Sequence, residues 1–249
     1  MRFQLDVVEG PTELAAEAAD VFIQLARQAL EQRGHFSVAL SGGSTPRALF
    51  QQLSDPIKAC QLDWQEVYLF WGDERCLPPE HPESNYGMTR QALLENIPIP
   101  PGNIVRVCGE LGAAGAAAAY QGSLQDFFGI ESLPRFDLIL LGLGEDGHTA
   151  SLFPGTPALE EGQRWVVGVE HRSPPPPLVD RVSLTLPVIN AARQVLFLVS
   201  GAAKAAVLER VLKPPRAGET ALPAQRIRPD PGQLTWLVDR ASLSDWIPS

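Results

Sequence analysis

The stretch Phe-Asp-Leu-Ile-Leu-Leu-Gly-Leu-Gly-Glu-Asp-Gly-His-Thr at residues 136–149 contains the pattern that decides the fold. A short, mostly apolar run from Phe136 to Leu141 leads directly into a glycine-rich polar segment from Gly142 to Thr149. Continuous rather than alternating apolar character is typical of strands buried on both faces of a parallel sheet. Similar runs occur at Phe36–Leu40, Val67–Trp71 and Val195–Val199.

Segments with helical patterns lie between these runs. They comprise Thr12–Gln32, Arg47–Leu53, Met88–Leu94, an alanine- and glycine-rich segment from Gly112 toward Phe128, and Ala202–Leu212. Further strands are expected at Trp165–Val169, Arg181–Leu186 and Trp236–Val238. Strand–helix alternation predicts an α/β fold with an open, mostly parallel sheet and helices on both faces. No shift in composition marks a boundary, so we expect one domain over residues 1–249.

The composition is that of an ordinary soluble globular protein, with 249 residues, 45% hydrophobic residues and 20% charged residues. It excludes a long disordered tail, a coiled coil and a collagen-like chain. The net charge of −9 argues against a nucleic-acid partner, because binding to a phosphate backbone requires a basic surface. A small anionic substrate remains compatible with this charge, since a few well-placed cations can dominate one cleft.

Three separated cysteines, Cys60, Cys76 and Cys108, form no Cys-x-x-Cys pair and fit a reducing compartment. The sequence starts without a signal-peptide pattern and has no apolar run of the ~20 residues that a membrane span requires. We therefore expect a cytoplasmic protein with no membrane partner. No cluster of His, Cys and carboxylates has metal-ligand spacing, so no metal or cofactor is expected. Composition leaves the oligomeric state open, and we favour a monomer.

Polar clusters follow four of the predicted strands. They are Ser41–Pro46, Gly72–Arg75, Gly142–Thr149 and Ser200–Lys204. Ligands of open α/β sheets bind beyond the carboxyl ends of the strands. If the four strands are parallel, all four clusters lie at one edge of the sheet. Their convergence is stronger evidence for a site than any single cluster.

The first cluster has the properties of an anion site. Gly42 and Gly43 permit a tight turn with exposed amides, and Ser44 or Thr45 can cap the next helix. Free amides at the positive end of a helix favour an anion such as phosphate. The alternative is a plain turn between a strand and a helix. A Walker A loop is excluded because the Gly-Lys-Ser/Thr ending is absent.

The third cluster contains Gly-x-G-x-x-Gly spacing at Gly142, Gly144 and Gly147, the dinucleotide-binding pattern. That interpretation is disfavoured because Pro154 shortens any helix that follows and because Asp146 would bring negative charge toward a diphosphate. The other interpretation makes His148 a catalytic base, since the unperturbed pKa of histidine lies near neutrality. Asp146 could then orient the imidazole or the substrate. A histidine satisfied by hydrogen bonds within the loop is the alternative.

Three cations follow or begin the predicted strands. Arg75 can bind a phosphate with two hydrogen bonds, and Asp73 could hold Arg75, bind a sugar hydroxyl or act as an acid or base. A surface salt bridge is the alternative. Lys204 lies in the first turn after Gly201, where it can point toward the sheet edge, although a solvated lysine is the commoner case. Arg181 begins a strand and is a weaker candidate.

Several motifs occur in a familiar order: Ser-Gly-Gly-Ser-Thr-Pro at 41–46, Gly-Asp-Glu-Arg at 72–75, Ser-Asn-Tyr at 84–86, Gly-Leu-Gly-Glu-Asp-Gly-His-Thr-Ala-Ser-Leu-Phe-Pro at 142–154, Arg-Val-Ser-Leu-Thr at 181–185 and Gly-Ala-Ala-Lys-Ala at 201–205. With them the sequence resembles the 6-phosphogluconolactonase family, from about residue 10 to about residue 240. The resemblance implies a Rossmann-like sheet similar to glucosamine-6-phosphate deaminases and ribose-5-phosphate isomerases. It also implies hydrolysis of 6-phospho-D-glucono-1,5-lactone to 6-phosphogluconate in the pentose phosphate pathway, without a cofactor.

The resemblance assigns roles to the matching positions. His148 would be the general base that activates water, and Arg75 and Lys204 would bind the phosphate together with the 41–45 loop. Asp73, Asp146 and Arg181 would line the site. A related amino-sugar phosphate isomerase/deaminase and a non-catalytic sugar-phosphate sensor remain the alternatives. Four features stay unassigned: His35, His81, His171 and Pro174–Pro177, a stretch expected to be a surface loop.

Overall fold

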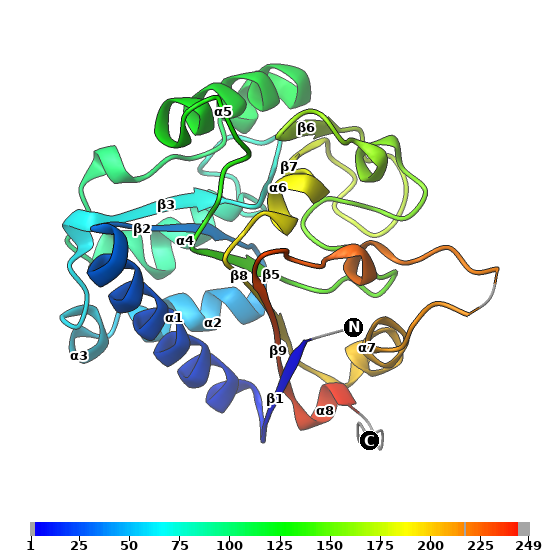
Figure 1. Ribbon diagram of the computed structural model, residues 1–249, viewed down its shortest axis with the longest axis horizontal. Helices are drawn as coiled ribbons and strands as arrows, with labels where there is room; N and C mark the ends of the chain where they lie inside the picture. Colours follow the sequence, from blue (N-terminus) through cyan, green and yellow to red (C-terminus); the bar gives the residue numbers. More distant parts are fainter. Residues whose placement is uncertain (1–2, 217, 244–249) are drawn as a thin grey trace.

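The main sheet of the computed structural model, which describes residues 3–216 and 218–243, has six strands paired in parallel (Figure 1). Their order is β1-β9-β8-β5-β2-β3. The bounds are β1 Gln4–Val8, β2 Phe36–Leu40, β3 Val67–Trp71, β5 Leu138–Leu141, β8 Gln194–Val199 and β9 Gln233–Asp239. The predicted α/β class with a mostly parallel sheet is confirmed, and the predicted bounds of β2 and β3 match those of the structure.

Helices cover both faces of this sheet, with α5 on one side and α1 and α2 on the other (Figure 1). The α-helices are α1 Pro11–Arg33, α2 Ser44–Leu53, α3 Pro56–Ala59, α4 Asn85–Ala92, α5 Gly112–Phe128, α6 Leu186–Asn190, α7 Ala205–Leu212 and α8 Arg240–Leu243. Short 3₁₀ helices span Trp64–Glu66, Leu94–Asn96, Pro101–Asn103, Gly109–Leu111, Pro157–Glu160, Ala202–Lys204 and Pro223–Arg226. Among the described residues, no helix is both long and apolar enough to cross a membrane.

Helix α1 shows how the sequence sets the ends of an element. Pro11 occupies its first turn, where a missing N–H costs nothing. Gly34 ends it with a left-handed backbone, φ 76°, and its N–H donates to the Leu30 carbonyl at 2.9 Å. The apolar stripe that includes Leu14 and Phe22 is fully buried against the sheet layer. Burial of this stripe, rather than helix propensity alone, stabilises a helix of this length.

A second, smaller sheet was not predicted. It joins β4 Asp73–Arg75, β7 Arg181–Leu184 and β6 Val166–Val169 in antiparallel pairs. The chain passes into it at Gly72, whose N–H donates to Leu40 of β2 and whose carbonyl accepts from Leu184. The polar cluster after β3 therefore becomes a strand, and its side chains are fixed by pairing with β7.

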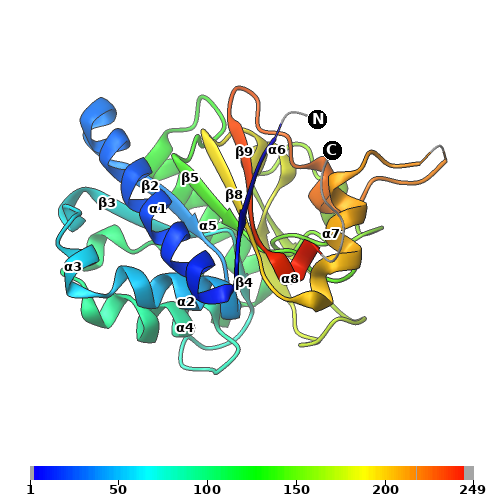
Figure 2. The same ribbon diagram turned by 90° about the horizontal axis from the view of Figure 1, so that it is seen from below.

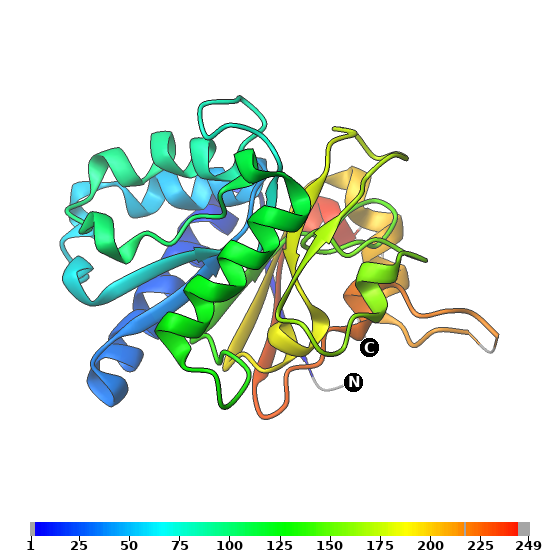
Figure 3. The same cartoon turned by 90° about the horizontal axis from the view of Figure 1, so that it is seen from above.

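Helix α5 packs closely on this second sheet (Figure 3). A Cβ at Gly168 of β6 would lie 2.8 Å from the backbone of Ala113, so only glycine permits this approach. The alanine- and glycine-rich first half of α5 is thus the part that meets the strand. Among the strands and α-helices of the described residues, five were missed by the sequence analysis: β1, β4 and the short helices α3, α6 and α8. The predicted helix Ala202–Leu212 is divided between a 3₁₀ turn and α7.

Candidate functional site

The loops that follow β2, β3, β5 and β8 meet in a pocket of about 270 Å³ at the carboxyl edge of the main sheet, here called the carboxyl-edge pocket. Its lining residues are Ser41, Gly42, Gly43, Asp73, Arg75, Asn85, Gly142, Leu143, Gly144, His148, Ala150, Arg181 and Lys204. Seven of the ten predicted site residues are therefore brought together. Ser44, Thr45 and Asp146 lie outside the lining.

His148 is oriented by its neighbour Asp146. Their side chains meet with 2.5 Å between Nδ1 and Oδ1, and the His148 backbone N–H donates to the same oxygen at 3.0 Å. Partial burial acts to raise the pKa of Asp146, but the hydrogen bonds from His148 outweigh it and leave that pKa below its usual value. Because Nδ1 is engaged by a carboxylate, Nε2 is the nitrogen left for a proton-transfer role.

The glycines of this loop make room for the His148 ring and for the turn beside it, and they do not form a dinucleotide site. A Cβ at Gly144 would lie 2.0 Å from His148 Nδ1, and Gly147 has φ +84° beside Leu222. The segment continues as turns with an isolated bridge between Thr149 and Leu152, and no helix begins there. The structure therefore lacks the helix N-terminus that a pyrophosphate site requires after this motif.

The first cluster differs from its prediction at the helix start. Gly43, with φ +108°, occupies the N-cap position of α2, and Ser44 is already the first helical residue. The prediction that Ser44 or Thr45 caps the helix is wrong, because the chain turns one residue earlier than expected. Gly42 is required because of its neighbour Asn85: a Cβ at residue 42 would lie 1.9 Å from Asn85 Oδ1. The two glycines thus bring backbone, not hydroxyl groups, to the pocket.

Arg75 and Arg181 face each other across the β4–β7 pair, where they are register partners. Like charges directly opposite each other destabilise a sheet. Both Nε atoms are buried without a hydrogen-bond acceptor in the part of the chain that the structure describes. Burial lowers the pKa of Arg181, and the Arg75 charge contributes in the same direction, while Asp73 opposes the shift. An anion between the two guanidiniums would relieve this arrangement.

Carbonyl oxygens hold the outer parts of these arginines. Arg75 Nη1 donates to the Glu83 carbonyl at 2.6 Å, and Arg181 Nη2 donates to the Pro177 carbonyl at 3.2 Å. The Glu83 carboxylate is farther away, 3.7 Å from Arg75 Nη1, and half exposed. Hydrogen bonds to carbonyl oxygens fix the two side chains but do not neutralise their charge. The surface salt bridge that was the alternative role of Arg75 is present only as this long contact with Glu83.

Asp73 is held by a serine and not by an arginine. Ser151 Oγ donates to Asp73 Oδ2 at 2.6 Å, and the Ser151 N–H donates to Ser183 Oγ at 3.2 Å. This buried chain ties the loop after His148 to strands β4 and β7 of the second sheet. The adjacent Ala150 has a left-handed backbone, φ 48°, which is uncommon for a non-glycine residue and marks a strained turn in the pocket wall.

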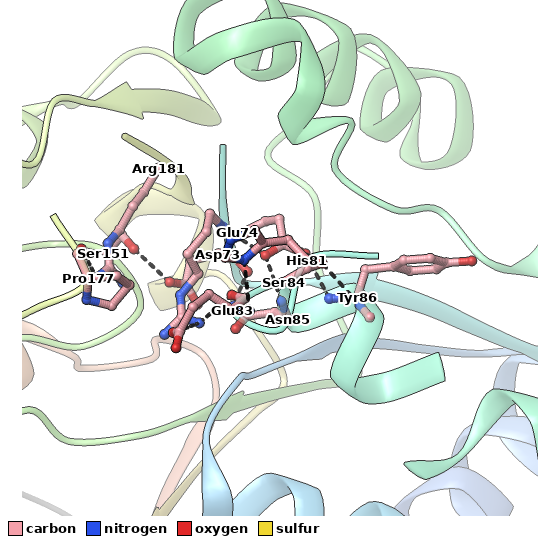
Figure 4. A network of polar contacts seen from close by, with 12 residues as sticks. Asp73, Glu74, His81, Glu83, Ser84, Asn85, Tyr86, Ser151, Pro177 and Arg181 are labelled. Carbon is pink, nitrogen blue, oxygen red and sulfur yellow. Dashed lines mark hydrogen bonds and ion pairs between the residues drawn. The ribbon is translucent and has the colours of Figure 1, made fainter. Parts of the chain in front are cut away.

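A buried carboxylate that the sequence analysis missed organises the loop beside the pocket (Figure 4). Glu74 is 2% exposed, and it accepts backbone N–H bonds from Arg75, Asn85 and Tyr86 at 2.7–2.8 Å. Ser84 Oγ donates to it at 3.2 Å. Burial raises the pKa of Glu74 despite these bonds. The network fixes the start of α4.

Asn85 enters the pocket from this start and was also missed as a site residue. Its Nδ2 donates to the Asp73 carbonyl at 2.9 Å, and its Oδ1 lies against Gly42. It therefore joins the loop after β2 to the loop after β3. The Ser-Asn-Tyr motif at 84–86 was the available signal, although the motif alone does not show that Asn85 reaches the Gly42–Gly43 turn.

His171 and the proline-rich stretch, both unassigned from sequence, lie against the site. Phe153 packs between two histidine rings, with centroids 4.5 Å from His148 and 4.3 Å from His171. His171 Nε2 is 2.6 Å from the Pro175 carbonyl, and Arg181 lies 5.5 Å from the centre of the Phe153 ring. The stretch Pro174–Pro177 is thus attached to the ring stack behind His148.

Lys204 reaches the pocket from the end of the 3₁₀ turn after β8. The turn is held by Asp239 of β9, which accepts from Ser200 Oγ at 2.5 Å and from the Gly201 N–H at 3.0 Å. Lys204 therefore lines the same pocket as Arg75 and Arg181 of the second sheet. Across the described residues, no group of three or more His, Cys, Asp or Glu is arranged to hold a metal ion.

Comparison with known proteins gives consistent matches. A family model described as glucosamine-6-phosphate isomerases/6-phosphogluconolactonase matches residues 9–236. A 6-phosphogluconolactonase from Nostoc sp. is 40% identical over 246 residues, which cover 97% of this chain and 98% of the relative. The structure of 6-phosphogluconolactonase from Trypanosoma brucei superposes with a TM-score of 0.88 and 29% identity, and 99% of each chain is covered.

A monomeric glucosamine-6-phosphate deaminase is a more distant structural relative. It superposes with a TM-score of 0.78 over 97% of this chain and 99% of its own, at 20% sequence identity. At that identity the likeness concerns the fold alone. The scaffold is therefore shared by two kinds of sugar-phosphate enzyme.

Proposed function

The chain belongs to the glucosamine-6-phosphate isomerase/6-phosphogluconolactonase family, and we propose that it is a 6-phosphogluconolactonase. It hydrolyses 6-phospho-D-glucono-1,5-lactone to 6-phosphogluconate, a step of the pentose phosphate pathway. One observation carries the assignment to this pocket. Two mutually opposed arginines, hydrogen-bonded to carbonyl oxygens, and an oriented histidine line the same cavity. That combination fits a phosphorylated substrate that must be attacked by water.

The phosphate is bound by Arg75, Arg181 and Lys204, with backbone amides of the Gly42–Gly43 turn as further donors. Arginine guanidiniums form charge-assisted, often paired, hydrogen bonds to phosphate oxygens. The phosphate charge also relieves the repulsion between the opposed arginines. Binding at this remote group fixes the lactone carbonyl before His148, so binding energy is converted into orientation.

His148 acts as the general base. Its Nε2 takes a proton from water as the water oxygen attacks the lactone carbonyl carbon, and Asp146 stabilises the imidazolium that forms. The tetrahedral intermediate places a negative charge on the former carbonyl oxygen, which pocket amides or a cation stabilise. The C1–ring oxygen bond then breaks, and His148 returns its proton to the ring oxygen. Because a lactone carbonyl is already electrophilic, the proposed route uses no cofactor.

The deaminase remains the second candidate, because the matching family and the fold include that activity. Both enzymes would bind a hexose 6-phosphate, so binding of phosphate does not separate them. A non-catalytic sensor is the third possibility, and it would bind 6-phosphogluconate without accelerating hydrolysis. An intact His148–Asp146 pair, which a sensor has no need to retain, argues against it.

The deciding experiment is a lactonase assay on freshly generated substrate, with spontaneous hydrolysis measured in parallel. We expect the protein to accelerate loss of the lactone and to release no ammonia from glucosamine 6-phosphate. Ammonia release without accelerated lactone hydrolysis would reverse the assignment. Binding of 6-phosphogluconate with neither activity would make the protein a sensor.

We further propose that the enzyme is a cytoplasmic monomer formed by one domain over residues 1–249. Its acidic surface, with a net charge of −9, supports the absence of a nucleic-acid partner. Light scattering at micromolar concentration, with and without 6-phosphogluconate, tests the oligomeric state. A dimer mass under both conditions would contradict the monomer.

A further inference from the structure

A second arginine-rich cavity, of about 390 Å³, lies at the opposite edge of the main sheet. We call it the amino-edge pocket, and its lining includes Arg33, Arg135, Asp137 and Arg193. These residues come from the end of α1 and from the segments just before β5 and β8. Figure 2 shows that β2, β5, β8 and β9 start on the side of the molecule where α1 ends. The cavity is therefore separated from the carboxyl-edge pocket by the length of the strands.

Asp137 is the acid at the centre of this cluster, and it is 4% exposed as a side chain. One oxygen, Oδ2, accepts from both the N–H and the hydroxyl of Ser37 at 2.9 Å. The other, Oδ1, is shared by Arg33 Nε at 2.9 Å and Arg193 Nε at 3.3 Å. Of the two, only Arg33 Nε is hydrogen-bonded to this oxygen; Arg193 Nε lies at ion-pair distance and is buried without a hydrogen-bond acceptor among the described residues.

The cluster retains an excess of positive charge. Three arginines and one aspartate leave two positive charges, because in the described part of the chain none of these arginines pairs with another carboxylate. Arg135 is exposed, and its Nη2 donates to the Pro231 carbonyl at 2.7 Å, a neutral acceptor. Arg33 Nη1 donates to the neutral Gln32 amide oxygen at 2.7 Å.

The remaining donors are available to a ligand. A guanidinium has five N–H donors, and the bonds above use only a few of those on the three side chains. Burial lowers the pKa of Arg193, and the charges of Arg135 and Arg33 act in the same direction against Asp137. The surrounding charge at Arg193 is therefore incompletely neutralised. A concave site with excess cations concentrates its field and attracts anions, even on a protein of net charge −9.

We propose that the amino-edge pocket is a second anion site, which binds a phosphate dianion, free or carried on a small metabolite. The charge of a phosphate monoester, close to two negative charges at neutral pH, matches the excess of the cluster. Planar guanidiniums suit phosphate oxygens better than they suit a monovalent spherical ion. The cavity exceeds the size of phosphate alone and admits part of an attached sugar. This site is independent of the lactonase reaction.

The test measures phosphate binding by titration calorimetry in a background chain with Arg75→Gln and Lys204→Gln, which weaken the carboxyl-edge pocket. Inorganic phosphate and glucose 6-phosphate are titrated separately at constant ionic strength. Arg135→Gln is the main variant, because Arg135 is exposed and its bond is to a carbonyl. Arg240→Gln is the matched control, since it removes the same charge from an exposed pair with Glu9.

We expect millimolar or tighter binding in the background chain. Arg135→Gln is expected to weaken it about tenfold or more, the range for losing a charge-assisted hydrogen bond. Arg193→Gln, whose fold is checked by circular dichroism, is expected to weaken it at least as much, and Arg240→Gln to leave it unchanged. If glucose 6-phosphate binds as tightly as inorganic phosphate, the ligand is a phosphate ester. If inorganic phosphate alone binds, the ligand is the free anion.

Absence of millimolar binding in the background chain overturns the proposal. An affinity that Arg135→Gln and Arg240→Gln change equally also overturns it, because the effect would then follow net charge rather than this pocket. Neither result bears on the lactonase, which is measured on the chain with an intact carboxyl-edge pocket.

Discussion

The two arginine-rich pockets lie at opposite ends of β5, and they differ in how their carboxylates are used. At the amino edge, Asp137 Oδ1 lies within ion-pair distance of Arg33 and Arg193. At the carboxyl edge, Asp73 Oδ2 accepts a hydrogen bond from Ser151, while Arg75 and Arg181 face each other with carbonyl partners. Asp137 is paired with the arginines, whereas Asp73 is hydrogen-bonded to a serine and acts on Arg181 only through its charge.

The difference separates a carboxylate that holds the fold together, Asp137, from one that leaves the neighbouring arginines to a ligand, Asp73. An ion pair that also bonds to the backbone of a neighbouring strand joins elements of the fold, as Asp137 joins β5 to Ser37 of β2. Opposed arginines whose one ion pair is the distant, half-exposed Glu83 weaken the free protein slightly and gain when an anion binds. Loss of Asp137 should therefore act mainly on stability. Changes at the carboxyl edge should act mainly on turnover and substrate affinity.

The largest expected effect is at the proposed base. His148→Ala should reduce kcat by roughly 10²–10⁴-fold, the usual contribution of general acid–base catalysis. The control is His35→Ala, because His35 lies before β2 on the amino side and contacts the rings of Tyr68 and Phe127. Steady-state kinetics on the lactone should show near-normal turnover for that variant. Near-normal turnover in His148→Ala would show that the histidine is not the general base, and the carboxyl-edge pocket would then lack its proposed catalytic residue.

The second effect is on stability at the amino edge. Asp137→Asn should lower the free energy of unfolding by about 3 kcal/mol, because two partly buried guanidiniums lose their counter-charge. Urea denaturation with linear extrapolation measures the change. The matched variant is Asp6→Asn, in a partly exposed carboxylate whose hydrogen-bond partner is the neutral Gln4, and its stability should be unchanged. If the two variants lower the free energy of unfolding by the same amount, Asp137 does not stabilise the fold more than an ordinary carboxylate does.

The stretch of residues 136–149 contains a residue of each pocket: Asp137 of the amino-edge pocket and His148 of the carboxyl-edge pocket. Its apolar run predicted β5, and its glycine-rich end led to His148, because each of these inferences uses neighbours along the chain. Asp137 was visible as a polar residue within the run. Its meaning was not, since its partner Ser37 is 100 residues away and the two arginines come from other elements.

The same physical limit explains the missed elements near the site. Strand β4 has three polar residues and forms only because β7, distant in sequence, supplies its partners. Glu74 was overlooked because a glutamate is rarely buried, and the backbone amides that hold it there are revealed only by the fold. The convergence of four strand ends, by contrast, needed only the parallel class of the sheet, which the buried apolar runs predicted correctly.

A third prediction concerns the opposed arginines. Arg75→Gln should raise KM for the lactone roughly 10–100-fold, the equivalent of one lost charge-assisted hydrogen bond, with a smaller change in kcat. The free energy of unfolding without ligand should stay the same or rise slightly, because one of two facing like charges is removed. An unchanged KM would exclude Arg75 from the phosphate site. A large loss of stability would show that Arg75 is used structurally, as Asp137 is at the amino edge.

The smallest expected effect is a pH dependence of stability that depends on Asp146. Since its hydrogen bonds with His148 hold the pKa of Asp146 below the usual value near 3.8, ionised Asp146 stabilises the folded state above that value. The contribution is lost as the pH falls through the lower, folded-state pKa. Urea unfolding at pH 5 should therefore show the wild type slightly more stable than Asp146→Asn. Below about pH 4 the difference should shrink. A difference that grows below pH 4 would contradict the lowered pKa of Asp146, and the 2.5 Å contact with Nδ1 would then need another role.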